Sequence, residues 1–223
     1  MAMRRLATMV LLAAAVPVSA QDAASDGVTI PAAPEAGGPQ VWEVTATALN
    51  LRAVPSTGAE VLDRLPSGAL LSNLGCEAVS GRVWCDVQRI EGGARGHVAF
   101  AYLRPAAGPD GQVARGLDQS AVRAGRGEFD ARGQVPCTAG GDAPSGQCDF
   151  AVARGAGGNA TLVLTRPDGG ERVLFFVYGR PIGASSSEAN PTGAFEATRN
   201  GDRHLIRVGA ERYDIPDAVV LGG

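Results

Sequence analysis

The chain has 223 residues, which is room for one or two modest domains. It contains no Lys, so apart from two His every basic side chain is an Arg, and the formal net charge is −3. An acidic chain without a cluster of Arg is poorly suited to bind nucleic acid or an anionic membrane surface, so we exclude both as partners.

Residues 1–20 have the pattern of a secretory signal peptide. Arg4 and Arg5 precede an apolar run, and the small residues up to Ala20 suit cleavage by a signal peptidase. The apolar run has about ten residues, whereas a membrane-spanning helix needs about twenty. We therefore expect a secreted or periplasmic protein without stable membrane insertion, which begins with a disordered Pro- and Ala-rich tether at residues 21–40.

Residues 41–104 consist of short apolar alternations interrupted by turn residues. Strands of a few residues at close, regular spacing are typical of a small antiparallel barrel, so this region predicts an all-β domain. The interruptions are Pro55-Ser56-Thr57-Gly58, Pro66-Ser67-Gly68, Ser80-Gly81 and Gly92-Gly93.

The same region resembles the bacterial SH3-like (SH3b) domain in a series of short motifs that occur in the family's order. These motifs are Leu49-Asn50-Leu51-Arg52, Pro55-Ser56, Leu65-Pro66-Ser67-Gly68, Val83-Trp84, Gly96-His97-Val98 and Tyr102-Leu103. The resemblance implies an SH3-like barrel domain that attaches extracytoplasmic proteins to peptidoglycan or to peptides. Such a fold hosts binding rather than one dedicated chemistry.

Four side chains of this region are candidates for ligand contact: Arg52, Trp84, His97 and Tyr102. Arg and aromatic residues supply most of the binding energy where they cluster in an interface. Structural roles compete with this interpretation. Arg52 is also suited to brace a loop, Trp84 and Tyr102 to fill the core, and His97 to pack on the barrel where the SH3-like family has Trp.

The four cysteines form two close pairs, which predicts two disulfides in an extracytoplasmic protein. If Ser80-Gly81 is a two-residue hairpin turn, Cys76 faces Cys85 at a non-hydrogen-bonded position, where a disulfide can close. Cys137 and Cys148 bracket a Gly-rich loop and form the second pair. No Cys-x-x-Cys spacing is present and neither His is near a pair, so we expect no metal site and no cofactor.

Residues 105–127 are predicted to be a linker with a short helix across Val113 to Ala124. Residues 128–223 are predicted to form a second all-β domain, an antiparallel β-meander whose first strand is held by the disulfide at Cys148. The expected strands are Cys148 to Ala153, Ala160 to Thr165, Arg172 to Tyr178, Ala194 to Arg199, Arg203 to Val208 and Glu211 to Pro216.

This second half also resembles a module that accompanies SH3-like domains in secreted proteins of Gram-negative bacteria, for which the resemblance implies no activity. The residues that carry it are Phe129-Asp130-Ala131, Val135-Pro136-Cys137, Cys148 to Arg154, Arg172 to Phe176 and Tyr213 to Asp217.

No catalytic motif is present: the sequence lacks a Gly-x-Ser-x-Gly elbow, a phosphate-binding Gly loop and a His-Glu-x-x-His helix. We therefore expect a non-enzymatic SH3-like binding module that engages cell-wall peptidoglycan or a peptide. Two alternative hypotheses stay open. In the first, the protein is an inhibitor or partner subunit of an extracytoplasmic hydrolase and contacts it through its own loop Thr138 to Gln147. In the second, the protein is itself a hydrolase, with a catalytic site built from His204 and the run Ser185 to Ser187.

Overall fold

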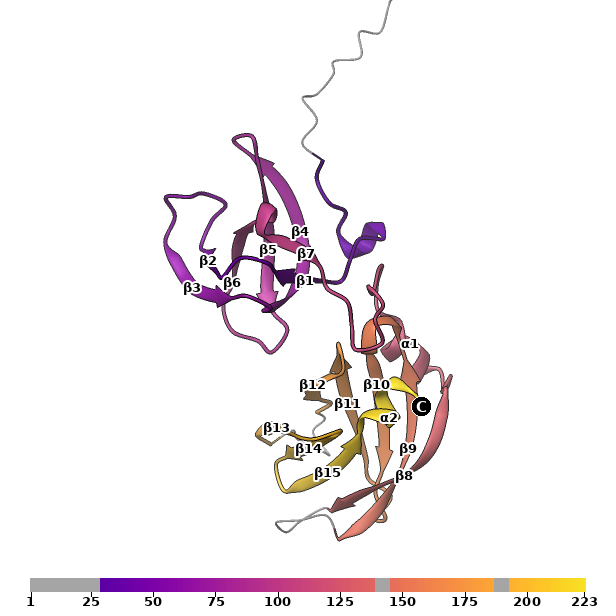
Figure 1. Ribbon diagram of the computed structural model, residues 1–223. Coiled ribbons are helices and arrows are strands. Elements are labelled where there is room, and N and C mark those ends of the chain that lie inside the picture. Colours follow the sequence, from indigo (N-terminus) through magenta and orange to yellow (C-terminus); the bar gives the residue numbers. More distant parts are fainter. Residues whose placement is uncertain (1–28, 139–144, 187–192) are drawn as a thin grey trace, which may run out of the picture.

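The computed structural model describes residues 29–138, 145–186 and 193–223, and the protein is an all-β molecule with two antiparallel sheets (Figure 1). The expected signal peptide, residues 1–20, lies outside the described residues. Within the described part, no helix is long and apolar enough to cross a membrane.

The first sheet has the strand order β3-β2-β6-β5-β4-β1-β7 and encloses its own core. Alternate residues of each strand point into that core: Leu49 and Leu51 are buried in β2, and Val98 is buried in β6. The strands are β1 (Val41–Val44), β2 (Ala48–Arg52), β3 (Val61–Pro66), β4 (Leu70–Val79), β5 (Arg82–Arg89), β6 (Arg95–Ala99) and β7 (Leu103–Pro105).

The hairpin between β4 and β5 confirms the predicted register and the first disulfide. Ser80 and Gly81 have φ angles of 50° and 73°, the left-handed conformation that a two-residue hairpin turn requires at both positions. Val79 consequently pairs with Arg82, and three pairs further along Cys76 pairs with Cys85. The Cα atoms of the two cysteines are 4.0 Å apart and their sulfur atoms are bonded.

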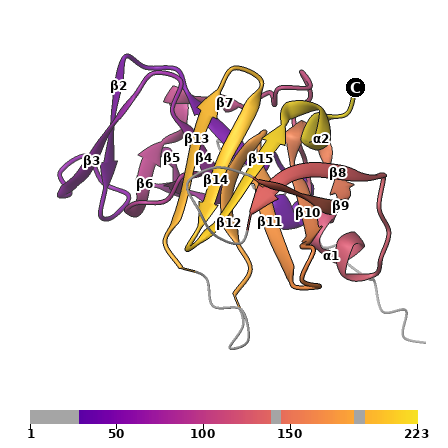
Figure 2. The same cartoon turned by 90° about the horizontal axis from the view of Figure 1, so that it is seen from below.

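The second sheet has the order β12-β11-β10-β9-β8-β15-β14-β13 and curls until its edge strands β12 and β13 contact each other (Figure 2). This gives the sheet a nearly barrel-like shape around a second apolar core. Its strands are β8 (Ala131–Thr138), β9 (Gly146–Arg154), β10 (Ala160–Thr165), β11 (Glu171–Val177), β12 (Arg180–Ala184), β13 (Phe195–Asn200), β14 (Arg203–Val208) and β15 (Glu211–Pro216).

The order of this sheet differs from the predicted simple meander. Strand β8, which was not predicted, precedes the Cys148 strand and lies between β9 and β15, where Tyr213 pairs with Cys137. The second predicted disulfide, Cys137–Cys148, joins β8 to β9. Both ends of the loop expected at Thr138 to Gln147 belong to these strands, and residues 139–144 lie outside the described residues.

Two short α-helices flank the second sheet, α1 (Ser120–Gly125) and α2 (Asp217–Leu221). The first is shorter than the helix predicted over residues 113–124. Gly116 has a left-handed φ of 72° and its N–H donates to the carbonyl of Gly38 at 3.0 Å, so this stretch pairs with the N-terminal segment instead of coiling. Helix α2 was not predicted.

Residues 29–40 are ordered from the point where the structure describes them, unlike the disordered tether expected for residues 21–40. They include a 3₁₀ turn, η1 (Pro34–Ala36), in which Pro34 is buried. The N–H of Gln40 donates to the carbonyl of Ala114 at 2.9 Å, and Nδ2 of Asn73 donates to the carbonyl of Pro39 at 2.8 Å. The segment is therefore held between the first sheet and the linker.

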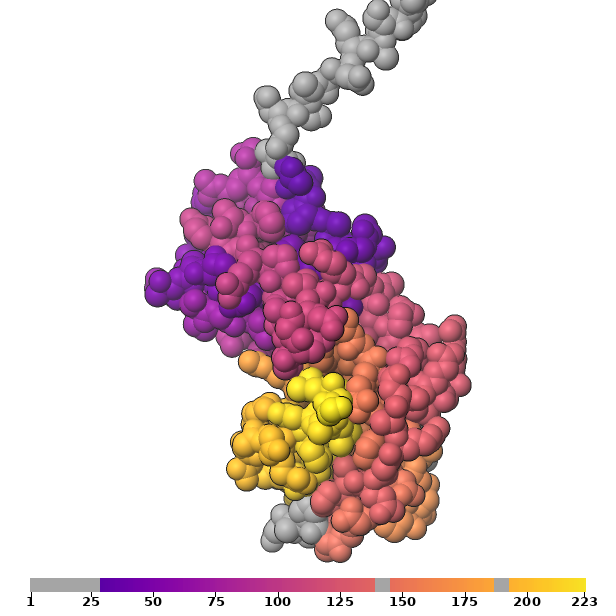
Figure 3. Space-filling model, turned by 45° about the vertical axis from the view of Figure 1, so that its right-hand side comes forward, coloured from indigo at the N-terminus to yellow at the C-terminus, as the bar shows by residue number. Residues whose placement is uncertain are grey.

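The two sheets pack against each other through the linker (Figure 3). Tyr178, at the turn between β11 and β12, is 4 % exposed, and its hydroxyl donates to the carbonyl of Ala106 at 3.0 Å. Nδ2 of Asn159 donates to Oε1 of Gln40 at 2.5 Å, and Arg180 forms an ion pair with Glu91. These contacts join residues that are far apart in the sequence, so the halves form one packed body.

Candidate functional site

Three of the four candidate binding residues line one hollow of about 340 Å³ on the outer face of the first sheet. Arg52 comes from β2, Trp84 from β5, and Tyr102 from the 3₁₀ turn η2 (Phe100–Tyr102). Small residues also line it, including Ala48 and Ala99.

Trp84 points away from the barrel core, because its neighbours in β5, Val83 and Cys85, belong to the core cluster and Trp84 does not. It is nevertheless only 4 % exposed, since Thr57 and Arg82 lie around it. Trp84 therefore lines both hollows, although most of its surface is already covered in the folded protein.

Arg52 also has the structural role that the sequence left open. Its Nη1 donates to the carbonyl of Ala59 at 2.7 Å, which braces the loop at residues 53–60. That hydrogen bond fixes the guanidinium beside the hollow, so bracing the loop and lining the hollow are compatible.

His97 and Tyr102 differ in their surroundings. Tyr102 is 49 % exposed at the rim of the hollow. His97 pairs with Arg52 and with Asp86 in the strand register but does not line the hollow. Its Nδ1 is buried and has no hydrogen-bond partner among the described residues. The structure therefore groups Arg52, Trp84 and Tyr102 and leaves His97 beside them.

A second hollow of about 350 Å³ adjoins the first and shares Thr57, Arg82 and Trp84 with it. Its other walls are the loop at residues 55–57 and the tip of the β4–β5 hairpin. We call the two hollows together the Trp84 groove. Arg82 was not among the predicted site residues, although it follows the predicted Ser80-Gly81 turn and lies two residues from Trp84, on the same face of the strand.

A larger hollow, of about 630 Å³, lies on the outer face of the second sheet beside α1. Val163 and Val173 pair across β10 and β11 in the strand register, and they line this hollow together with Phe175. Asp149 and Glu171 lie at the Thr165 end of the same strands.

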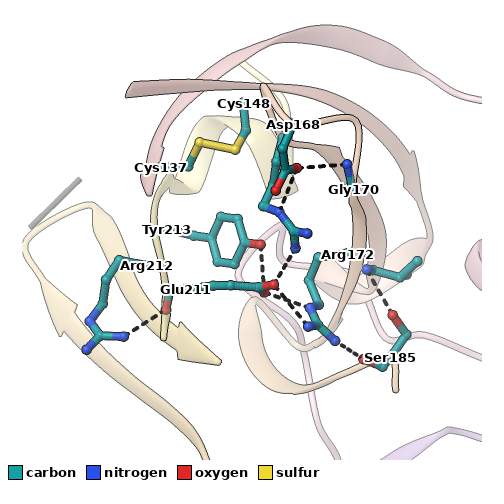
Figure 4. Close-up of polar contacts among 11 residues, drawn as sticks. Cys137, Cys148, Asp168, Gly170, Arg172, Ser185, Glu211, Arg212 and Tyr213 are labelled. Atoms are coloured by element: carbon teal, nitrogen blue, oxygen red, sulfur yellow. Dashed lines mark hydrogen bonds and ion pairs between the residues drawn. A yellow bond between two sulfur atoms is a disulfide. The ribbon is translucent and has the colours of Figure 1, made fainter. Parts of the chain in front are cut away.

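The interior of the second sheet contains a buried ionic network that the sequence analysis missed (Figure 4). Arg172 is 2 % exposed and donates from Nε to Oε2 of Glu211 at 2.8 Å. Tyr213 donates to the same oxygen at 2.9 Å, and Arg166 forms an ion pair with the other oxygen. Nη1 of Arg172 donates to the carbonyl of Ser185 at 2.5 Å. Each charge is thus hydrogen-bonded, as burial demands.

This network shifts the ionisation of its members in opposite directions. Burial opposes the charge on Glu211, but the hydrogen bonds from Arg172 and Tyr213 and the two nearby guanidinium charges lower its pKa below the ordinary value. Burial, followed by the neighbouring carboxylate, raises the pKa of Tyr213. Glu211 is therefore ionised and Tyr213 protonated in the folded protein, which suits a structural role.

The contacts of His204 and Ser185 do not bring them together. Nε2 of His204 lies 3.0 Å from Oδ1 of Asp217, and its ring packs on Phe176. Ser185 instead accepts a hydrogen bond on its Oγ from the N–H of Val173. Val173 and Phe176 are three residues apart in β11, a distance of roughly 10 Å along the strand, so Ser185 and His204 contact different parts of β11. Ser187 lies outside the described residues.

His204 predicts how stability depends on pH. Burial lowers its pKa, against the charge of Asp217, so the folded protein binds a proton there less readily than the unfolded chain. The contribution of neutral His204 to stability is fully present above the unfolded pKa of about 6.5. This contribution is lost as the pH falls from there toward the lowered pKa of His204 in the folded protein. His204→Gln is expected to flatten the fall in melting temperature below pH 6.5. A fall as steep in His204→Gln as in the unmodified protein would contradict this assignment.

Comparison with protein-family models, with curated proteins and with solved structures finds no match to this chain. Among the described residues, no group of three or more His, Cys, Asp or Glu is placed to hold a metal ion. The two disulfides indicate an oxidising, extracytoplasmic environment.

Proposed function

We propose that this protein is a secreted or periplasmic, non-enzymatic binding protein. Its first sheet is an SH3-like barrel that engages cell-wall peptidoglycan or a peptide through the Trp84 groove. The observation that carries the proposal is the convergence of Arg52, Trp84 and Tyr102 in one hollow. These residues were selected from separate motifs of the SH3-like resemblance, and they come from three elements of the fold.

The chemistry of the groove suits an extended chain with polar backbone groups. Trp84 and Tyr102 offer apolar rings, while Asn50, Thr57 and the arginines offer hydrogen-bond donors. The two hollows adjoin each other through Thr57, Arg82 and Trp84 and are open to the surface. Extended peptides bind to such sites with aromatic anchors and scattered polar contacts.

Trp84→Ala tests the proposal directly. We expect the variant to lose detectable pelleting with purified peptidoglycan sacculi, a weakening of at least about tenfold, because Trp is among the residues that carry most of the binding energy in a binding site. Tyr102→Ala, at an exposed position, is expected to weaken pelleting without altering the melting temperature. Far-UV circular dichroism of both variants checks that the fold is retained.

Phe175→Ala serves as the matched control, because it removes an aromatic ring from the hollow on the second sheet. Its pelleting is expected to equal that of the unmodified protein. Normal pelleting by Trp84→Ala, or loss of pelleting by Phe175→Ala alone, would move the binding site away from the first sheet.

A further inference from the structure

We propose that the Trp84 groove selects a peptide that carries a carboxylate, and that the Arg82 guanidinium holds this carboxylate. The inference rests on the proposed function and names its ligand chemistry: the stem peptides of peptidoglycan, which carry both free carboxylates and the methyl groups of alanine.

The charge of the groove is the first observation. Of the side chains that line its two hollows, Arg52 and Arg82 are cationic and none is an Asp or a Glu. The whole chain has a formal charge of −3, so a cationic groove runs against its overall character. A cleft lined by charge of one sign attracts ligands of the opposite sign.

The second observation is that Arg82 has no partner in the described part of the chain. Most arginines there pair with a carboxylate or a carbonyl. Within the same sheet, Arg95 donates to Asp86, and Arg104 donates to Glu43 at 2.7 Å. Arg82, by contrast, makes no side-chain hydrogen bond or ion pair with any described residue. Its planar guanidinium therefore keeps its donors available, and two parallel N–H groups match a carboxylate in geometry and charge.

Two carboxylates lie near this face in the strand register: Glu77 pairs with Trp84 across β4 and β5, and Asp86, two residues from Trp84 in β5, is engaged by Arg95. Glu77 does not line either hollow and forms no ion pair with Arg82. Glu77 therefore does not occupy the groove, and the guanidinium of Arg82 is available to a carboxylate of the ligand.

The third observation is the small size of several lining side chains. Ala46, Ala48 and Ala99 line the first hollow together with Trp84, so part of its lining is small and apolar. A small apolar group such as a methyl suits this part of the lining. A carboxylate next to an alanine methyl thus matches both the cationic and the small apolar residues of the groove.

The experiment compares mock-treated sacculi with sacculi whose carboxyl groups have been converted to amides by a carbodiimide and ammonium chloride. The unmodified mature protein is expected to bind amidated sacculi at least about tenfold more weakly than mock-treated sacculi. Arg82→Gln is expected to bind mock-treated sacculi about tenfold more weakly and to be insensitive to amidation. Arg82→Lys, which keeps the charge and loses the paired donors, should lie between.

Arg126→Gln is the matched control, because Arg126 is exposed, lies outside the first sheet and makes no side-chain hydrogen bond with a described residue. It is expected to behave like the unmodified protein. If Arg126→Gln lost as much binding as Arg82→Gln, the loss would be explained by the change in net charge alone, and the inference would be overturned.

The remaining outcomes separate this inference from the proposed function. Equal binding to both kinds of sacculi overturns the carboxylate ligand and leaves wall binding intact. Sensitivity to amidation that persists in Arg82→Gln assigns the carboxylate to another residue and overturns the role of Arg82. Failure to bind either kind of sacculus rejects the proposed function itself, and the stem-peptide ligand falls with it.

Discussion

Glu211→Gln is expected to lower the free energy of unfolding by about 3–5 kcal/mol, the usual cost of breaking a buried ion pair by removing one partner. The substitution leaves the guanidinium of Arg172, which is 2 % exposed, without its counter-charge, and it deprives Arg166 of the same partner. A small domain is stable by only about 5–15 kcal/mol, so this loss is a large fraction of the total.

Urea denaturation, followed by far-UV circular dichroism, measures the change. The matched control is Glu196→Gln, whose partner Arg207 lies 3.4 Å away in an ion pair with a 60 % exposed carboxylate side chain. An exposed pair contributes about 0–1 kcal/mol, so the control is expected to change stability very little. Similar losses in both variants would show that the buried network contributes no more than a surface pair.

The pH dependence of the same variant supplies a second readout. The pKa of Glu211 is lowered in the folded protein, so its contribution is present above the unfolded pKa of about 4.3 and is lost as pH falls through the folded value. Glu211→Gln is therefore expected to be less sensitive to acid in this range than the unmodified protein, although it is less stable at neutral pH.

Tyr178→Ala is expected to cost about 3–5 kcal/mol, the usual penalty for deleting a buried aromatic side chain. Tyr178 packs with Val41, Ile90 and Ala114 between the two sheets, and its hydroxyl donates to the carbonyl of Ala106. Because this cluster joins the two halves, the loss should also uncouple them. A single thermal unfolding transition is expected to become two.

Differential scanning calorimetry distinguishes this result from general destabilisation. Tyr178→Phe keeps the ring and removes only the hydrogen bond, so it is expected to cost about 1–3 kcal/mol and to retain a single transition. Tyr102→Ala removes a 49 % exposed tyrosine and is expected to change stability by less than about 0.5 kcal/mol. A single, unshifted transition in Tyr178→Ala would show that the interface does not couple the sheets.

The sequence alone determined those features that depend on neighbouring residues. The Ser80-Gly81 turn set the pairing of β4 with β5 and placed Cys76 opposite Cys85, because the register of a hairpin follows from its turn. Strands β10 and β15 have the predicted bounds, since β10 is an apolar, β-prone run and in β15 the buried Tyr213 and Ile215 alternate with polar residues. Arg52, Trp84 and Tyr102 were proposed as candidates from local motifs, and the structure shows that they line one hollow.

Strands whose residues disfavour β structure were decided by tertiary pairing. Strand β8 contains Gly133 and Pro136, and β12 contains Pro181 and Gly183, so neither resembles a strand in the sequence. Each forms because its neighbour offers a hydrogen-bonding edge; the disulfide to Cys148 also holds β8 in place. Because β8 also pairs with β15, the sheet is curled and does not have the simple meander order that was expected.

The groove and the buried network depend on contacts between distant residues, which no local pattern encodes. Arg82 became a candidate only when folding placed it beside Thr57, whose loop is far away in the sequence. Arg172 and Glu211 are 39 positions apart and meet inside the curled sheet. Local propensity and turn chemistry therefore determined the hairpins and one disulfide register. Only the tertiary structure decided the strand order, the packing of the two halves and the charge of the groove, because these depend on which distant surfaces are buried together.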